Sequence, residues 1–219
     1  MHIIRHRVNT IEELRLVLKD FGVEVDIRSW GSELIVEHDA FKKGVLVQDW
    51  LAQYAHGLLI ANVKEDGLED RLTELFTAAA IPNFVFLDLP MPTLLRKAKQ
   101  GPIRAAARVS KYESVENAIK LAEFCEWVWV DHLEGYLPSQ KELLLLKNAG
   151  FKVCLVSPEL VFGVNHDISP FTAALKERRF IPDAVCSKFP ERWVGWHQSV
   201  LSNTDRLEAQ RDHRTISTP

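Results

Sequence analysis

The chain has 219 residues, of which 47% are hydrophobic and 26% are charged, and its formal net charge is −3 at pH 7. This length and mixture suit one globular domain, and the slight acidic excess argues against nucleic-acid binding, which calls for a basic surface. No stretch approaches the ~18 apolar residues that are needed to span a bilayer, so no transmembrane segment is expected.

The three cysteines, Cys125, Cys154 and Cys186, lie in or beside apolar runs and form no C-x-x-C pair. Such cysteines are expected to be buried free thiols, which are typical of reducing compartments. The N-terminal residues lack the long apolar segment of a secretory signal. Together these features predict a cytoplasmic protein.

Short apolar runs, rich in Val, Ile, Phe and Trp, alternate with amphipathic stretches from one end of the chain to the other. We expect strands near residues 2–5, 22–27, 58–64, 83–88, 103–109, 126–131, 151–156 and 183–187. We expect helices near residues 10–21, 46–54, 67–80, 91–100, 113–123, 138–149 and 167–178. Alternating strands and helices imply a parallel sheet that is covered on both faces.

Eight strands favour closure into an α/β barrel of the (β/α)8 TIM type over the alternative, an open doubly wound sheet. We expect the barrel to form one compact domain over residues 1–200. Residues 201–219 are polar with alternating charge, and we expect a surface helix or a loose tail there.

Local signals mark several helix ends. Thr10 and Glu13 have the spacing of a capping box, in which each side chain bonds the backbone of the other residue. Gly150 is expected to end a helix just before a strand, because glycine readily adopts the left-handed conformation. Gly22 is expected to do the same before the second strand.

Polar side chains gather around the first two predicted strands. His6 and Arg7 directly follow the first strand, and Glu24 and Asp26 are two residues apart in the second, so they share a face. Two carboxylates inside a barrel repel each other and are costly to desolvate unless a cation lies between them. Mg²⁺ or Ca²⁺ would suit this position because such cations favour oxygen ligands.

Further candidates follow along the chain. His38 comes after a short apolar run, and Asn62 and Lys64 share a face near the end of the next strand, where barrel enzymes place their active sites. A phosphodiester anion needs positive charge around its oxygens, which a metal together with Arg7 and Lys64 would supply. His6 and His38 could remove one proton and deliver another, because histidines titrate near neutral pH.

Other polar residues follow or end later strands. Asp88, Arg108, Asp131 and Lys188 would be aimed at the same mouth by barrel geometry. Residues of this kind more often cap the following turn, so they are secondary candidates.

In this order the residues resemble the glycerophosphodiester phosphodiesterases, in the wider group of phospholipase C-like phosphodiesterase barrels. That family has a His-Arg start, a nearby Asn-Thr, a Glu-x-Asp strand and then His-Asp, and it usually closes with a strand that ends in Thr-Asp-x-Pro. The corresponding segments here are His6-Arg7, Asn9-Thr10, Glu24-Val25-Asp26, His38-Asp39 and residues 183–192. The resemblance spans residues 3 to 193.

The resemblance implies a TIM barrel that hydrolyses a small soluble phosphodiester with the help of a divalent cation, Mg²⁺, Ca²⁺ or Mn²⁺. It makes His6 and His38 the acid/base pair. It has Arg7 and Lys64 hold the phosphate group of a small-molecule phosphodiester substrate.

The resemblance also makes Glu24 and Asp26 metal ligands. Asn62 occupies the place of the family's third acidic ligand, and its amide oxygen can still bind Mg²⁺ or Ca²⁺ but brings no charge. Val8 stands where the family has glycine, and Lys188 stands where it has aspartate.

Two other functions remain open from the sequence. A barrel with a neutral third ligand could bind a phosphate ligand without turning it over. A sugar-phosphate lyase or isomerase would also suit a barrel, and its Schiff-base form would need a reactive lysine, either Lys64 or Lys188. A homodimer is a further option.

Overall fold

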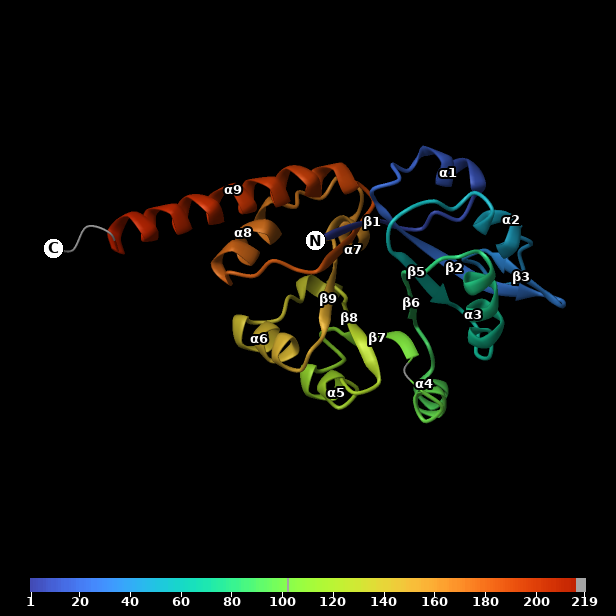
Figure 1. Ribbon diagram of the computed structural model, residues 1–219. Coiled ribbons are helices and arrows are strands. Elements are labelled where there is room, and N and C mark those ends of the chain that lie inside the picture. Colours follow the sequence, from blue (N-terminus) through green and yellow to red (C-terminus); the bar gives the residue numbers. More distant parts are fainter. Residues whose placement is uncertain (102, 216–219) are drawn as a thin grey trace.

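A closed sheet of parallel strands forms the centre of the molecule, and helices surround it (Figure 1). The computed structural model describes residues 1–101 and 103–215, with side chains to Ser202. The barrel strands are β1 (His2–Arg5), β2 (Gly22–Trp30), β5 (Leu59–Val63), β6 (Phe84–Leu87), β7 (Ile103–Val109), β8 (Cys125–Val130), β9 (Lys152–Val156) and β10 (Ala184–Ser187).

The sheet closes because β1 pairs in parallel with β2 on one side and with β10 on the other. Every other strand of the barrel pairs in parallel with its neighbour in chain order. The expected (β/α)8 TIM barrel is therefore confirmed, with all eight expected strands in place, and the sheet is not the open alternative.

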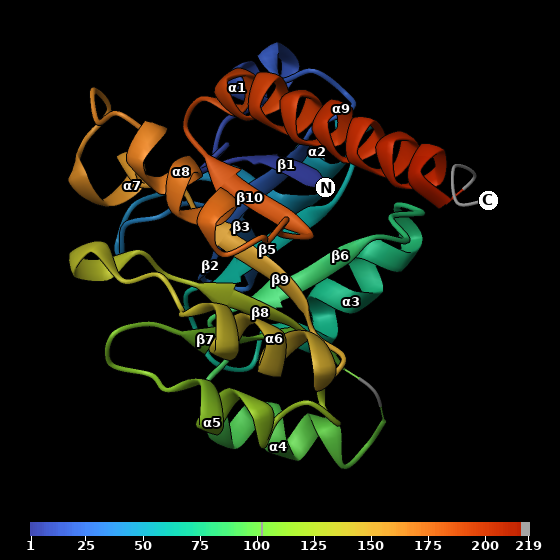
Figure 2. The same cartoon turned by 90° about the vertical axis from the view of Figure 1, so that its left-hand side faces the viewer.

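The helices lie outside the strands, as Figure 2 shows from a second side. They are α1 (Ile11–Leu16), α2 (Val47–Leu51), α3 (Glu69–Ala78), α4 (Met91–Ala98), α5 (Val115–Ile119), α6 (Gln140–Asn148), α7 (Glu159–Phe162), α8 (Ser169–Glu177) and α9 (Pro190–Thr215), with a short 3-10 turn, η1 (Leu133–Gly135), after β8. All seven expected helices are present, and most are shorter than the sequence pattern indicates.

An antiparallel hairpin lengthens the second strand beyond the barrel wall. β3 (Glu33–Val36) pairs with the end of β2, and β4 (Val45–Leu46) pairs with β3. Because this extension has its own backbone partners, β2 runs to Trp30 instead of ending near residue 27. The loop after β3 carries His38.

The apolar core has two layers, one inside the barrel and one between the strands and the helices. Val23, Val25 and Ile27 belong to the outer layer, so the alternate residues of β2 face the barrel interior. The inner layer contains both tryptophans of β8 and the thiols of β9 and β10, with these residues among others: Ile4, Ile60, Trp127, Trp129, Cys154 and Cys186. All three cysteines are buried and free, as expected.

The expected capping box at Thr10 is present, with the Thr10 hydroxyl and the Glu13 carboxylate each accepting from the other residue's backbone. Gly150 has the expected left-handed backbone, with φ of 92°. Gly22 differs from the expectation, because α1 ends at Leu16 and Gly22 lies within β2. There, an added Cβ would lie 2.6 Å from the Leu58 carbonyl oxygen, so close packing explains this glycine.

The last helix crosses the expected end of the barrel domain. α9 runs without interruption from Pro190 to Thr215, so a helix forms there, and its far end lies beyond the barrel in Figure 1. The end of the expected tail, residues 216–219, lies outside the described residues. No helix in the described part of the chain, including α9, is long and apolar enough to cross a membrane.

Candidate functional site

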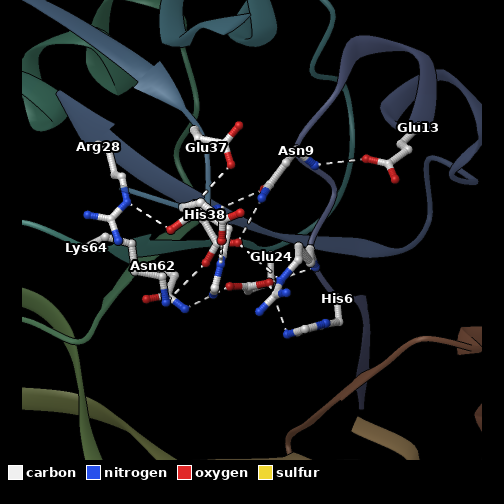
Figure 3. Close-up of polar contacts among 12 residues, drawn as sticks. His6, Asn9, Glu13, Glu24, Arg28, Glu37, His38, Asn62 and Lys64 are labelled. Atoms are coloured by element: carbon white, nitrogen blue, oxygen red, sulfur yellow. Dashed lines mark hydrogen bonds and ion pairs between the residues drawn. The ribbon is translucent and has the colours of Figure 1, made fainter. Parts of the chain in front are cut away.

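Polar side chains meet at the C-terminal ends of β1, β2 and β5. His6 directly follows β1, Glu24 and Asp26 lie on β2, and Asn62 lies on β5 opposite Asp26 in the strand register. Figure 3 shows the side chains of His6, Glu24 and Asn62 pointing toward one another. The alternation of the two strands therefore brings these groups to one mouth of the barrel.

Glu24 is the centre of this group and is almost fully buried, with 1% exposure. Its Oε2 accepts the backbone N–H of Arg7 at 2.7 Å, and its Oε1 accepts the Asn62 amide at 3.0 Å. The His6 Nε2 atom lies 3.7 Å from Oε2. The carboxylate is thus held mainly by neutral donors.

The backbone of Arg7 makes the first of these bonds in an uncommon conformation. Arg7 has φ of 53°, in the left-handed region that residues other than glycine rarely adopt. The neighbouring contacts with Glu24 and Asp26 hold this residue in place. Strain of this kind gathers at functional sites, where the surrounding structure fixes it.

Asp26 is equally buried but is surrounded by cations. Asn9 donates its amide to Oδ2 at 2.8 Å and accepts the Asp26 backbone N–H at 3.0 Å. The Arg7 guanidinium lies 3.4 Å from Oδ2, and the Lys64 ammonium lies 3.2 Å from Oδ1. These two side chains balance the charge of Asp26 directly.

Burial raises the pKa of Glu24, and the nearby Asp26 charge adds to the effect, while the hydrogen bond from Asn62 opposes it. Burial also lowers the pKa of His6 to about 3, with the Lys188 and Arg7 cations as the next causes. His6 is therefore neutral at neutral pH and can accept a proton. Its Nδ1 atom is buried and has no hydrogen-bond partner among the described residues.

The oxygen atoms of this site fit a divalent cation. The Oδ1 atom of Asn62 is buried and unpartnered within the described part of the chain. Among the described residues, Glu24 forms no ion pair with a lysine or arginine, and the His6 ring beside it is neutral. A cation would satisfy both groups. The donor set is two carboxylates and an amide. Among the side chains that the structure describes, in residues 1–101 and 103–202, there is no cluster of three or more His, Cys, Asp or Glu suited to a metal.

His38 lies apart from these contacts. Its side chain is 39% exposed, and its Nδ1–H donates to the Asp39 carboxylate at 2.8 Å. Arg28 holds the loop by donating Nε–H to the His38 carbonyl at 2.9 Å. Among the described residues, His38 makes no hydrogen bond or ion pair with His6, Glu24 or Asp26. Six of the seven predicted side chains thus form one contact network, and the seventh is outside it.

A chain of ion pairs continues around the mouth from this network. The Lys64 ammonium lies 3.8 Å from Asp88, and the Arg108 guanidinium contacts both Asp88 and Asp131. Trp129 donates its indole N–H to Asp131 at 3.0 Å. Three of the secondary candidates, Asp88, Arg108 and Asp131, therefore form a row of ion pairs that links the ends of β5 and β8.

Sequence reasoning missed the role of Glu159, which is 2% exposed at the start of α7. It accepts the Ser187 hydroxyl at 2.5 Å, the Lys188 backbone N–H at 3.0 Å and the Ser157 hydroxyl. The serines at the ends of β9 and β10 were the available signal, because buried hydroxyls need partners. Asn9 was named only within a motif, and its two hydrogen bonds to Asp26 were also not predicted.

No protein-family model matches the sequence, and no curated protein matches it significantly. Solved structures do match the fold. A protein from Agrobacterium tumefaciens, provisionally named a glycerophosphoryl diester phosphodiesterase, has a TM-score of 0.66 at 13% identity, covering 92% of this chain and 99% of its own. Glycerophosphodiester phosphodiesterase from Thermotoga maritima has a TM-score of 0.60 at 16% identity, covering 88% and 96%.

A third structure, a glycerophosphoryl diester phosphodiesterase from Parabacteroides distasonis, has a TM-score of 0.63 at 12% identity and covers 91% of this chain and 86% of its own. At such identities the likeness is one of fold. The expected resemblance to the glycerophosphodiester phosphodiesterases is therefore confirmed for the fold: this chain is a TIM barrel similar to theirs over nearly its whole length.

Proposed function

We propose that this chain is a divalent-cation-dependent phosphodiesterase that hydrolyses a small soluble phosphodiester of the glycerophosphodiester kind. The observation that carries the proposal is the network at Glu24, where a buried carboxylate has a neutral imidazole beside it and the cations of Arg7 and Lys64 nearby. A neutral base next to positive charge suits the attack of water on an anionic ester. The fold shared with glycerophosphodiester phosphodiesterases supports the same reaction.

Arg7 and Lys64 would hold the phosphate oxygens. Both cations already contact Asp26, which fixes their positions at the mouth of the barrel. Groups that are held in place before the substrate arrives stabilise the developing charge without rearranging. Asp26 would thus act as the positioning residue for both cations.

A divalent cation, Mg²⁺, Ca²⁺ or Mn²⁺, would be held by Glu24 and Asn62, with Asp26 as the third oxygen donor. When bound, such an ion draws charge from the phosphate oxygens. The buried Oδ1 of Asn62 and the raised pKa of Glu24 support its place between these two residues.

His6 and His38 would move the protons. His6, neutral at neutral pH, would take a proton from the attacking water as the new oxygen–phosphorus bond forms. His38 would give a proton to the leaving alkoxide as its bond to phosphorus breaks. The Asp39 carboxylate accepts from Nδ1 of His38, which leaves Nε2 to act as the donor.

Two substrates test these roles separately. Bis(p-nitrophenyl) phosphate has a leaving group that departs without a proton, whereas glycerophosphocholine releases an alkoxide that needs one. We expect both to be hydrolysed with added Mg²⁺, Mn²⁺ or Ca²⁺ and not with EDTA. His6→Ala should lower kcat for both by about 10²–10⁴-fold, and His38→Ala should lower it mainly for glycerophosphocholine. His2→Ala is the control, because His2 lies at the opposite end of β1.

Full activity of His6→Ala would refute the proposed base. Equal effects of His38→Ala on the two substrates would refute the proposed acid. Activity that EDTA does not change would refute the cation dependence, even if the barrel is a phosphodiesterase.

One observation favours a second function, a barrel that binds a phosphate ligand without hydrolysing it. Lys64 and Arg7 both contact Asp26, so two cations are already held at the mouth without any metal. Calorimetry separates the two functions. Tight binding of a glycerophosphodiester with no need for a cation and no turnover would support the binding protein.

A further inference from the structure

A cavity of about 270 Å³ lies beside His6, between the loop after β1 and the first turn of α9. Its lining includes Arg5, His6, Arg7 and Lys188, together with apolar side chains of α1 and of the segment that follows α1. The two segments meet because β1 and β10 are neighbours in the barrel and the His6 N–H donates to the Ser187 carbonyl. Any molecule bound at Glu24 and His6 would therefore have this cavity next to it.

Two cations of the cavity have no acidic partner. Among the described residues, neither the Lys188 ammonium nor the Arg5 guanidinium forms an ion pair with a carboxylate; Arg5 instead donates to the Lys188 carbonyl. The cavity has two carboxylates, but Glu13 is used in the capping box of α1 and Glu191 is exposed on α9. Two half-buried positive charges thus lack a directly bonded carboxylate in the described part of the chain, and the charges of Glu13 and Glu24 act on Lys188 from further away.

Hydrogen bonds to a buried side chain fix the backbone of the segment that carries Lys188. The buried Glu159 accepts the Lys188 backbone N–H and the Ser187 hydroxyl, which ties the end of β10 to α7. A cation on a held backbone loses less freedom when it binds a ligand than one on a loose loop. The position of Lys188 is therefore set before a ligand arrives.

The electrostatic effects agree with this geometry. Burial lowers the pKa of Lys188, and the Arg7 and Arg5 charges lower it further. Lys188 is likewise the main charge that lowers the pKa of His6. Like charges held together in this way are relieved when an anion binds among them.

We propose that the cavity binds a second anionic group of the substrate, a phosphomonoester, which is held by Arg5 and Lys188 while the phosphodiester lies at Glu24. Two unpaired cations match the two negative charges of a phosphomonoester, and arginine and lysine are the side chains that recognise such groups. This inference rests on the proposed phosphodiesterase function and narrows its substrate class to phosphodiesters with an extra phosphate on one alcohol.

Two substrates that differ by one phosphate test the inference. They are glycerophosphoinositol and glycerophosphoinositol 4-phosphate, compared by kcat/KM with added Mg²⁺. We expect wild-type protein to prefer the 4-phosphate about tenfold or more, and high salt to reduce this preference. Lys188→Met, which keeps the aliphatic stem, should clearly reduce the ratio of the two kcat/KM values, because Arg5 alone would then hold the second phosphate. Lys152→Met is the control, because Lys152 is exposed at the opposite end of β9.

A binding measurement separates this inference from the proposed function. Calorimetry gives Kd for both compounds, whether or not they are hydrolysed. Tighter binding of the 4-phosphate that is lost in Lys188→Met, with no turnover of either compound, would support the cavity and refute the enzyme. Turnover of both compounds with equal kcat/KM and equal Kd would overturn the cavity and leave the phosphodiesterase standing. A preference for the 4-phosphate that is as large in Lys188→Met as in wild-type protein would also overturn it.

Discussion

Asn62 donates its side-chain amide to the Glu24 carboxylate at 3.0 Å, across the neighbouring strands β5 and β2. This bond leaves the Asn62 oxygen buried without a partner in the part of the chain that the structure describes. The Asn62 side chain therefore has a hydrogen-bonded amide nitrogen beside an amide oxygen that lacks a partner. A cation at the unsatisfied oxygen would also face Glu24, and this relationship can be tested by changing Asn62.

Asn62→Asp should make the protein's stability depend on divalent cations. A third carboxylate beside Glu24 and Asp26 adds repulsion in a buried site, so without a cation we expect a Tm lower by about 4–8 °C, or about 2 kcal/mol for a chain of this size. Mg²⁺ or Ca²⁺ should restore the Tm more strongly than in wild-type protein. Thermal unfolding with and without EDTA measures both effects.

Asn83→Asp is the control for that experiment, because Asn83 is exposed just before β6, at the other end of the barrel. Its Tm should not respond to cations beyond the wild-type response. If Mg²⁺ stabilises Asn62→Asp no more than wild-type protein, the cation does not bind between Asn62 and Glu24.

Glu24→Gln should remove activity and yet stabilise the cation-free protein at neutral and alkaline pH. The pKa of Glu24 is raised in the folded state, so the unfolded chain loses this proton first and stability falls as pH rises from about 4.5 toward the folded value. Glutamine stays neutral and avoids this loss, which we expect to be about 1–2 kcal/mol. Urea unfolding across this pH range, with EDTA present, measures it.

The exposed substitution Glu177→Gln provides the comparison for Glu24→Gln. It should leave the pH dependence of unfolding unchanged. A Glu24→Gln variant whose stability follows the wild-type curve at every pH would show that Glu24 is not strained by its burial.

The barrel could be predicted because each strand carries its own local signal. Alternation in β2 placed Glu24 and Asp26 on one face and Val23 and Val25 on the other, and the structure has this arrangement. Helix ends were less well predicted, since tertiary packing decides where a helix stops. A helix was expected to extend to residue 21, but α1 ends at Leu16.

The contacts of the site depend on relations that no local pattern fixes. Lys64 reaches Asp26 only because β2 and β5 pair in one register. The N–H of Arg7 reaches Glu24 through a left-handed backbone, which an arginine does not signal. His38 was expected at the mouth, but the hairpin that carries it was not foreseen, and its side chain lies exposed beside Asp39.

The low pKa of His6 predicts a pH profile without the usual histidine step. With a folded value of about 3, the base form of His6 is present throughout the neutral and mildly acidic range, so kcat/KM should show no acid limb near pH 6.5 from this group. Lys188→Met removes the largest charge that lowers this pKa and should move the His6 titration upward. An NMR titration of the ring carbons follows His6 directly.

The same shift affects stability. Between about pH 6.5 and 3 the unfolded chain binds a proton at His6 and the folded chain does not, so His6 lowers stability as pH falls through this range. His6→Gln should flatten this part of the curve, while His2→Gln, at the other end of β1, should not. A His6 titration near its ordinary value would contradict both expectations.

Glu159→Ala should destabilise the barrel, because Glu159 is a buried carboxylate with several hydrogen-bond donors around it. Its carboxylate accepts from Ser157, Ser187 and the Lys188 N–H, and all of these donors would be left without an acceptor in a buried place. Each buried unsatisfied group costs about 1–3 kcal/mol, so we expect a loss of about 2–4 kcal/mol after partial relaxation. Glu159→Gln keeps the shape and one of the two acceptor oxygens, which can still serve Ser187 and the Lys188 N–H, so it should lose about half as much. Urea unfolding measures both variants against exposed Glu177→Ala.

Because the same carboxylate positions Lys188, Glu159→Gln should also weaken the preference for a substrate with a second phosphate. A variant as stable as Glu177→Ala would mean that Ser157, Ser187 and the Lys188 N–H find other partners, and that Glu159 does not hold the end of β10 in place.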